Sequence, residues 1–187
     1  MAPIKVDEIT DVNSSEYIQL NRVHYTQQGV AKTWDVAKVH DSVAILLHEK
    51  DTDAFILVKQ VRPAVYLKNG DGFTYELCAG IVDKDTSLAQ IAKEEILEEC
   101  GYDVPLESIE RVTSFYTAVG FAGSVQTLYF AEVTESMRVS AGGGIDTELI
   151  EVITLPVNEA KAFIFDESKA KTPGVMFAFI WFLEHKV

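Results

Sequence analysis

One segment near the middle of the chain changes its hydrophobic period and constrains the fold more than any other. Between residues 87 and 100, apolar residues recur at every fourth position: Leu88, Ala92, Ile96 and Cys100. This spacing predicts an amphipathic helix. Ser87 with Gln90 fits an N-terminal capping box, and Gly101 is suited to end the helix in a left-handed conformation. The sequence therefore places one well-defined helix between segments of a different period.

Short apolar runs lie on both sides of this helix and predict strands. Before it come "SVAILLHEK", "AFILVKQVRP" and, after the turn-rich "LKNGDG", "FTYELCAGIV". After it come "ERVTSFYTAVG", "SVQTLYFAEVT" and "LIEVITLP". A short helix is expected near "VNEAKAFIF" and a final apolar helix at "GVMFAFIWFLEHK". This order of elements is typical of an α/β fold.

The N-terminal region has a different pattern. Residues 15–40 contain two alternating stretches around "QQG", which predicts a β-hairpin. Because two strands alone are marginally stable, they must pack on the rest of the chain or on a second copy of it. Tyr17, Tyr25 and Trp34 would otherwise expose apolar surface, so we expect this region to mediate dimerisation.

Composition excludes several partners. The net charge of −13 disfavours nucleic acid and anionic lipid, and no apolar run reaches the roughly 18 residues that span a bilayer. The N-terminus has no apolar region of the secretory type, which predicts a cytoplasmic protein. Cys78 and Cys100 match no zinc spacing and are expected to be reduced, partly buried thiols.

The central helix carries an unusual concentration of acid. Glu95, Glu98 and Glu99 are spaced i, i+3 and i+4, and like charges at this spacing repel. A solvated acidic face usually interleaves lysines, and only Lys93 is close by. Hard divalent cations, by contrast, need several converging carboxylate oxygens. The helix alone leaves both interpretations open, a solvated face or a metal site.

The longer segment "LCAGIVDKDTSLAQIAKEEILEECGY" closely resembles the Nudix box, G-x5-E-x7-R-E-U-x-E-E-x-G-U, where U is a bulky aliphatic residue. The positions that match are Gly80, Glu95, Ile96, Glu98, Glu99 and Gly101. Two positions depart from the pattern, with Thr86 in place of the first Glu and Glu94 in place of the Arg. In the family these two residues brace the motif while the later glutamates bind metal. The departures therefore bear on rigidity and rate more than on metal binding, and Lys93 is expected to take part of the arginine's place.

The flanking segments are similar to one branch of that family, the ADP-ribose and nucleoside-diphosphate-sugar pyrophosphatases. "KQVRP" resembles the strand whose arginine, here Arg62, meets the diphosphate. "YELCAGIV" resembles the segment in which the carbonyl of the residue before the glycine, here Ala79, binds metal. "YTAVGFAGSVQTLYF" is similar to the loop and strand after the box, with the usual acidic residue replaced near Ser124, and Gly120 in this loop is expected to contact substrate.

The resemblance implies a Nudix α/β/α sandwich with a mixed sheet (residues 41–187), an N-terminal β appendage (residues 1–40) and a homodimer. It implies hydrolysis of a nucleoside diphosphate sugar, UDP-glucose first, to UMP and glucose 1-phosphate. The required metal is Mg²⁺, with Mn²⁺ as a substitute. ADP-ribose, giving AMP and ribose 5-phosphate, is the second substrate. The resemblance also leaves open a nucleotide-binding module with weak turnover and a nucleoside triphosphate hydrolase.

The same resemblance assigns roles to individual residues. The Ala79 carbonyl, Glu95, Glu98 and Glu99 would bind metal, and Glu98 would also take part in catalysis. A general base is expected in the loop after "AGGG", either Glu148 or Asp146, and the glycines would let this loop open and close. Substrate contacts are expected from Arg62, which could instead be an ordinary surface charge, and from Trp34 and Tyr66, which could instead serve in packing.

Overall fold

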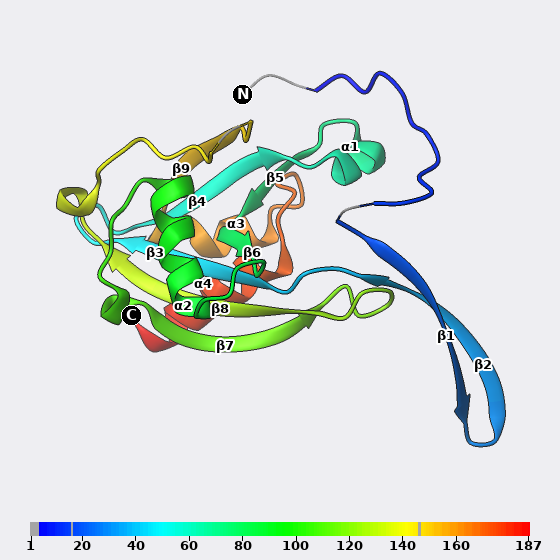
Figure 1. Ribbon diagram of the computed structural model, residues 1–187. Coiled ribbons are helices and arrows are strands. Elements are labelled where there is room, and N and C mark those ends of the chain that lie inside the picture. The colour runs from blue at the N-terminus through cyan, green and yellow to red at the C-terminus, as the bar shows by residue number, and fades with distance from the viewer. Residues whose placement is uncertain (1–3, 16, 146) are drawn as a thin grey trace.

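The structure is a computed structural model that describes residues 4–15, 17–145 and 147–187. A mixed sheet packed between helices forms the main body, and a two-stranded hairpin extends from it (Figure 1). The hairpin strands are β1 (Gln19–Gln27) and β2 (Val30–Lys38). The strands of the main sheet are β3 (Ser42–Glu49), β4 (Ala54–Val61), β5 (Phe73–Glu76), β6 (Cys78–Ile81), β7 (Glu110–Thr117), β8 (Ser124–Val133) and β9 (Ile150–Pro156).

The α-helices are α1 (Pro63–Asn69), α2 (Leu88–Glu95), α3 (Ala160–Phe165) and α4 (Pro173–His185). A π-helical turn (Ile96–Cys100) continues α2. Short 3₁₀ turns lie at Leu106–Ser108, Glu135–Met137 and Val157–Glu159. Within the described ranges, no helix is both long and apolar enough to cross a membrane.

Strand β3 organises the sheet. It pairs in parallel with β8 along its whole length, and β7 completes that side. On its other side, residues 42–45 pair with β6 and residues 47–49 pair with β4, both antiparallel. Strand β4 pairs with β9 along most of its length, and beyond its contact with β3 it also pairs with β5. The sheet therefore divides beside β3, with β4 and β6 on the two branches.

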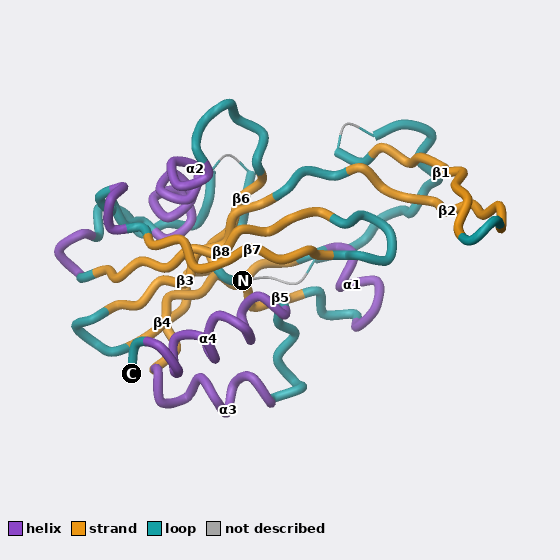
Figure 2. Tube along the Cα trace, turned by 90° about the horizontal axis from the view of Figure 1, so that it is seen from below, coloured by secondary structure: helices purple, strands orange, loops and turns teal. Residues whose placement is uncertain are grey.

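Both faces of the main sheet are covered. On one face, Val43, Ile45 and Leu47 of β3 pack in a cluster with α2 and its π-helical turn. On the other face, Ala44 and Leu46 pack with α3 and α4. Figure 2 shows α2 on one side of the sheet and α3 with α4 on the opposite side. This arrangement confirms the α/β/α sandwich with a mixed sheet, and explains why β3 is apolar at successive positions instead of alternating.

The predicted N-terminal hairpin is present, and it is far more exposed than the main sheet. Every residue of β1 is exposed, and so are most residues of β2. Gln28 and Gly29 connect the strands with φ of 52° and 78°, the two positive values that a tight hairpin turn of type I′ requires. The base of the hairpin is joined to the main body, because the Ala37 N–H donates to the Phe121 carbonyl at 2.7 Å.

One element departs from expectation. The beginning of the turn-rich "LKNGDG" is not a turn, because residues 67–69 belong to α1. Pro63 occupies the first helical position, where its missing N–H costs nothing. Gly70 ends the helix with φ of 74°, and its N–H donates to the Tyr66 carbonyl at 2.8 Å. Both signals are visible in the sequence, at the two ends of a segment of only seven residues.

Candidate active site

The predicted central helix forms with the expected ends. The Ser87 hydroxyl accepts the Gln90 N–H at 3.2 Å, and Gly101 ends the segment with φ of 79°. Ala92 and Ile96 are fully buried against the sheet, as predicted. The last five residues form the π-helical turn, a variation that is frequent at functional sites. We call residues 88–100 the box helix.

The glutamates of the box helix lie against strand β6. Glu95 lies over Gly80 so closely that a side-chain carbon at residue 80 would overlap its carboxylate. Glu99 is buried, and its Oε2 accepts the Ala79 N–H at 2.9 Å. Glu98 is half-buried, and its carbonyl accepts the Gly144 N–H at 3.1 Å. The requirement for glycine at residue 80 is therefore steric.

Two of these carboxylates titrate far from the ordinary range. Burial raises the pKa of Glu99 to about 8, assisted by the negative charge of Glu95 and opposed by the Ala79 N–H. Burial raises the pKa of Glu95 to about 7, with further contributions from Glu98 and Glu148. Ionising both carboxylates on this side of the box helix therefore costs free energy in desolvation and repulsion, and a bound cation would offset that cost.

The donors at this position suit a hard cation. Carboxylate and carbonyl oxygens are the ligands that Mg²⁺ prefers, and Glu95, Glu98, Glu99 and the Ala79 carbonyl supply only oxygen. Among the residues that the structure describes, no three carboxylate, imidazole or thiol groups are arranged closely enough to enclose an ion. Side chains of the box helix would therefore have to turn toward a common point on metal binding.

The glycine-rich loop is attached to the C-terminal end of the box helix. The Gly143 N–H donates to the Glu99 carbonyl at 2.8 Å, beside the bond from Gly144 to Glu98. A side-chain carbon at Gly142 would overlap the Glu99 carbonyl, and one at Gly101 would overlap that of Ser140. In this structure the glycines permit close backbone contact with the helix end, a role that the prediction of a mobile loop did not include.

This attachment brings Glu148, the expected general base, near the glutamates of the box helix. Glu148 interacts electrostatically with both Glu95 and Glu99. Its carboxylate also accepts the Ile145 N–H at 3.0 Å, so it folds back on its own loop. Asp146, the other candidate base, lies outside the described residues.

Arg62 lies at the end of β4 and points toward the same acidic region. Its Nε and Nη2 bind the two carboxylate oxygens of Glu76 at 2.8 and 2.7 Å. Glu76 is nearly buried and accepts a third hydrogen bond from the Thr74 hydroxyl at 2.6 Å. Arg62 itself is about half exposed and interacts electrostatically with Glu99 and Glu148. Glu76 was not predicted to belong to the site, because nothing in the sequence pairs it with Arg62.

The remaining predicted substrate contacts lie in two places. Tyr66 is on α1, next to Arg62, and is half-buried. Trp34 and Gly120 lie together at the base of the hairpin, where the indole N–H donates to the Gly120 carbonyl at 2.8 Å. Figures 1 and 2 both show this base well away from α2. The structure therefore pairs Trp34 with Gly120 and leaves both apart from the glutamates of the same chain.

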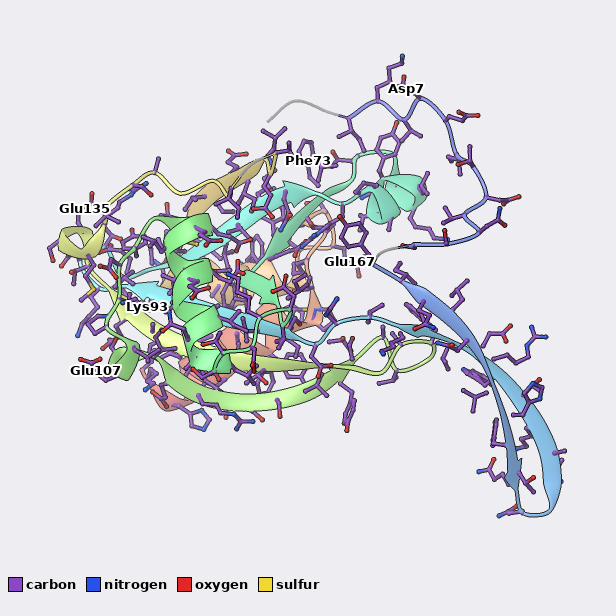
Figure 3. All side chains as sticks on the ribbon, in the orientation of Figure 1. Asp7, Phe73, Lys93, Glu107, Glu135 and Glu167 are labelled. Carbon is purple, nitrogen blue, oxygen red and sulfur yellow. The ribbon has the colours of Figure 1, made fainter. Side chains whose placement is uncertain are left out.

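Lys93 does not take the place expected for it. Figure 3 labels Lys93 on the box helix. Its ammonium lies 3.2 Å from the carboxylate of Asp103, a residue beyond the C-terminal end of that helix. Glu94 instead pairs with Lys84 at 2.6 Å, in the segment before the helix. Cys78 and Cys100 are both free, and they are fully buried in the core beneath the helix instead of partly buried as expected.

The layered fold and the helix-borne glutamates over a glycine-containing strand define a class of protein. Residues 38–173 match the NUDIX domain, and the chain belongs to the Nudix family.

The chain also resembles individual members over most of its length. It is 40% identical to uridine diphosphate glucose pyrophosphatase NUDT14 of Bos taurus, covering 90% of this chain and 89% of the bovine protein. It is 39% identical to the protein of the same name from Mus musculus, covering 92% and 91%. It is 33% identical to GDP-mannose pyrophosphatase of Cronobacter sakazakii, covering 84% of each chain.

Proposed function

We propose that this protein hydrolyses the diphosphate bond of nucleoside diphosphate sugars, with UDP-glucose as the first substrate and UMP and glucose 1-phosphate as products. The proposal rests mainly on one observation, that Glu95 and the buried Glu99 of the box helix lie against β6, where the sheet divides, within electrostatic range of Glu148 and, for Glu99, of Arg62. Membership in the Nudix family and the names of the mammalian relatives agree with it. In the reaction, water oxygen bonds to one phosphorus, the bond between that phosphorus and the bridging oxygen breaks, and the bridging oxygen leaves with the other phosphate.

The glutamates of the box helix would hold the metal that this reaction needs. Bound Mg²⁺ supplies positive charge that stabilises the phosphate oxygens as the bridging bond breaks. Glu95, Glu98, Glu99 and the Ala79 carbonyl would be its ligands. Glu95 and Glu99 must lose their protons to serve, and their raised pKa values make this step depend on pH near neutrality.

Glu148 would accept the proton of the attacking water. It lies close enough to the metal-binding glutamates to interact with them electrostatically, and its loop is attached to their helix through Gly143 and Gly144. To act, its carboxylate must give up the Ile145 N–H and turn toward the water. Asp146 remains the second candidate for the base.

Arg62 would bind the diphosphate. Its planar guanidinium suits two phosphate oxygens at once, and Glu76 fixes the orientation of that plane by a two-point contact. One terminal nitrogen, Nη1, is not used in this contact. Tyr66 lies one helical turn after Arg62, on α1, and would contact the same substrate.

A direct comparison of substrates tests the proposal, because GDP-mannose pyrophosphatases are among the relatives. The experiment is hydrolysis of UDP-glucose, GDP-mannose and ADP-ribose with Mg²⁺ in ¹⁸O-labelled water. The products are then separated, and their molecular masses are measured to locate the label. We expect UMP and glucose 1-phosphate from the best substrate, with the label on one product. Absence of turnover on all three, or faster turnover of nucleoside triphosphates, would contradict the proposal.

We also propose that residues 1–40 form a dimerisation region beside a hydrolase domain of residues 41–187. The exposed apolar side chains of the hairpin support this: Ile18, Leu20, Val23, Tyr25, Val30 and Trp34. In a dimer, Trp34 could reach the substrate of the partner, a role its position excludes within one chain. Light scattering at micromolar concentration tests the dimer, and a mass of 20.8 kDa would refute it.

The two free thiols are compatible with a cytoplasmic location, which stays a prediction.

A further inference from the structure

An ion pair connects the segment before the box helix to the helix itself. The Lys84 ammonium lies 2.6 Å from one carboxylate oxygen of Glu94. The other oxygen accepts the side-chain N–H of Gln90 at 3.1 Å, one helical turn earlier. Both oxygens of Glu94 are therefore occupied, and its carboxylate presents a fixed partner to Lys84.

The pair of Lys84 with Glu94 joins a neighbour of Glu95 to the segment that leads from β6 into the box helix. Glu94 immediately precedes Glu95, which lies over Gly80. Lys84 belongs to the segment that runs from Gly80 to the start of the helix. That segment is otherwise attached at its ends, where the Val82 N–H donates to the Asp41 carbonyl at 2.8 Å and Ser87 caps the helix.

Lys84 also lies within electrostatic range of two proposed metal ligands, Glu95 and Glu98. Its charge opposes the repulsion among the carboxylates when no metal is bound. The residue thus has two separable effects, since it fixes the segment through Glu94 and it places a positive charge near the metal site.

We propose that Lys84 and Glu94 are positioning residues whose ion pair holds residues 81–87 against the box helix, so that β6 and Glu95 keep the spacing that metal binding requires. This inference rests on the proposed function of the same glutamates. It assigns a support to Glu94, one of the two box positions that depart from the family pattern, with the acid on the helix and the base, Lys84, two residues before the other departing position, Thr86. Lys93 cannot provide this support because it pairs with Asp103.

Amide hydrogen exchange across residues 82–87 of the metal-free full-length protein tests the contact without reference to activity. Lys84→Met and Glu94→Gln should each speed exchange about two- to fivefold, the range an exposed ion pair supports. The exchanged pair Lys84→Glu/Glu94→Lys should return the rates close to those of the parent protein. Lys93→Met is the matched control, since it removes one lysine from a different ion pair, and it should leave the exchange rates of these amides unchanged. Unchanged rates in both single variants, or no recovery in the exchanged pair, would overturn the inference.

Calorimetric titration with Mn²⁺ separates the two effects of Lys84. Loss of its positive charge alone would strengthen cation binding, whereas loss of the support should weaken it. We expect Lys84→Met to weaken Mn²⁺ binding about two- to fivefold, with recovery in the exchanged pair. Tighter binding in Lys84→Met would show that only the charge matters and would refute the positioning role. If the parent protein bound no Mn²⁺ and hydrolysed no nucleotide sugar, the proposed function would fail while the exchange result still decided the contact.

Discussion

The two ends of the box helix are held in different ways. Toward the N-terminus, the Ser87 cap and the pair of Lys84 with Glu94, a residue midway along the helix, are polar contacts in competition with water. At the C-terminal end, Gly101 and Gly142 bring two backbone segments so close that no side chain fits between them. The first end can exchange one polar contact for another at little cost, whereas the second has no room for a different packing. We call the N-terminal half of the box helix, up to Glu94, the open end, and its C-terminal end, at Gly101, the closed end. Tolerance to substitution should therefore fall from the open end to the closed end.

The largest effect is expected from Glu99→Gln at the closed end. The change removes a buried negative charge but keeps an oxygen that can accept the Ala79 N–H, so the fold should persist. Mg²⁺-dependent turnover should fall on the order of a thousandfold because a metal ligand is lost. The measurement is kcat for UDP-glucose at saturating Mg²⁺, beside unfolding in urea. Glu94→Gln at the open end is the matched control, and its kcat should fall only a few-fold. Equal losses of kcat in the two variants would contradict the distinction between the two ends.

The next effect is on stability, in Gly142→Ala. Gly142 has φ of 67°, and a side-chain carbon would overlap the Glu99 carbonyl. Backbone strain and displacement of the loop should together reduce the free energy of unfolding by about 2–4 kcal/mol. Urea denaturation measures this loss. Gly120→Ala serves as the control, because nothing lies within 4 Å of the added carbon and Gly120 is not among the positive-φ glycines. A loss below about 0.5 kcal/mol in Gly142→Ala would show that the closed end can relax.

The third prediction concerns pH and the metal-free protein. The pKa values of Glu95 and Glu99, about 7 and about 8, exceed the ordinary value of 4.5, so the native state binds protons more tightly than the unfolded chain. Stability should therefore fall as pH rises from about 5 to about 8. Urea midpoints measured with a chelator present should show this fall, and Mg²⁺ should offset it. The slope should be smaller in Glu99→Gln, and an unchanged slope would mean that other groups cause it.

The sequence predicts the box helix and both of its ends because the relevant signals are local. Apolar spacing locates the helix, Ser87 marks its start, and Gly101 marks its end. The strands and the hairpin follow from alternation and from the "QQG" turn. The spacing of Glu95 and Glu99 shows that they share a face, and the resemblance to the Nudix box identifies which face bears the chemistry.

The contacts that the sequence does not predict join residues across loops or between strands. Arg62 meets Glu76 only because β4 and β5 pair in one register, and the register is not readable from either strand alone. Lys84 meets Glu94 because the intervening segment turns back along the helix, which depends on the path of a loop. The attachment of Gly143 to Glu99 joins segments more than forty residues apart.

The smallest effect is expected from restoring the family's residues at the open end, in Thr86→Glu/Glu94→Arg. Glu94→Arg alone would place a second cation beside Lys84 and lose the bond from Gln90. Thr86 is exposed, so an added glutamate there can pair with the new arginine without burying charge. Because one exposed ion pair replaces another, the free energy of unfolding should change by less than about 0.5 kcal/mol. Lys84→Glu/Glu94→Arg, which removes the repulsion between residues 84 and 94, should be at least as stable, and Glu94→Arg alone should be the least stable of the three variants in urea. If the free energy of unfolding of Thr86→Glu/Glu94→Arg fell by more than about 2 kcal/mol, the open end would tolerate substitution no better than the closed end. An exposed salt bridge cannot account for so large a change.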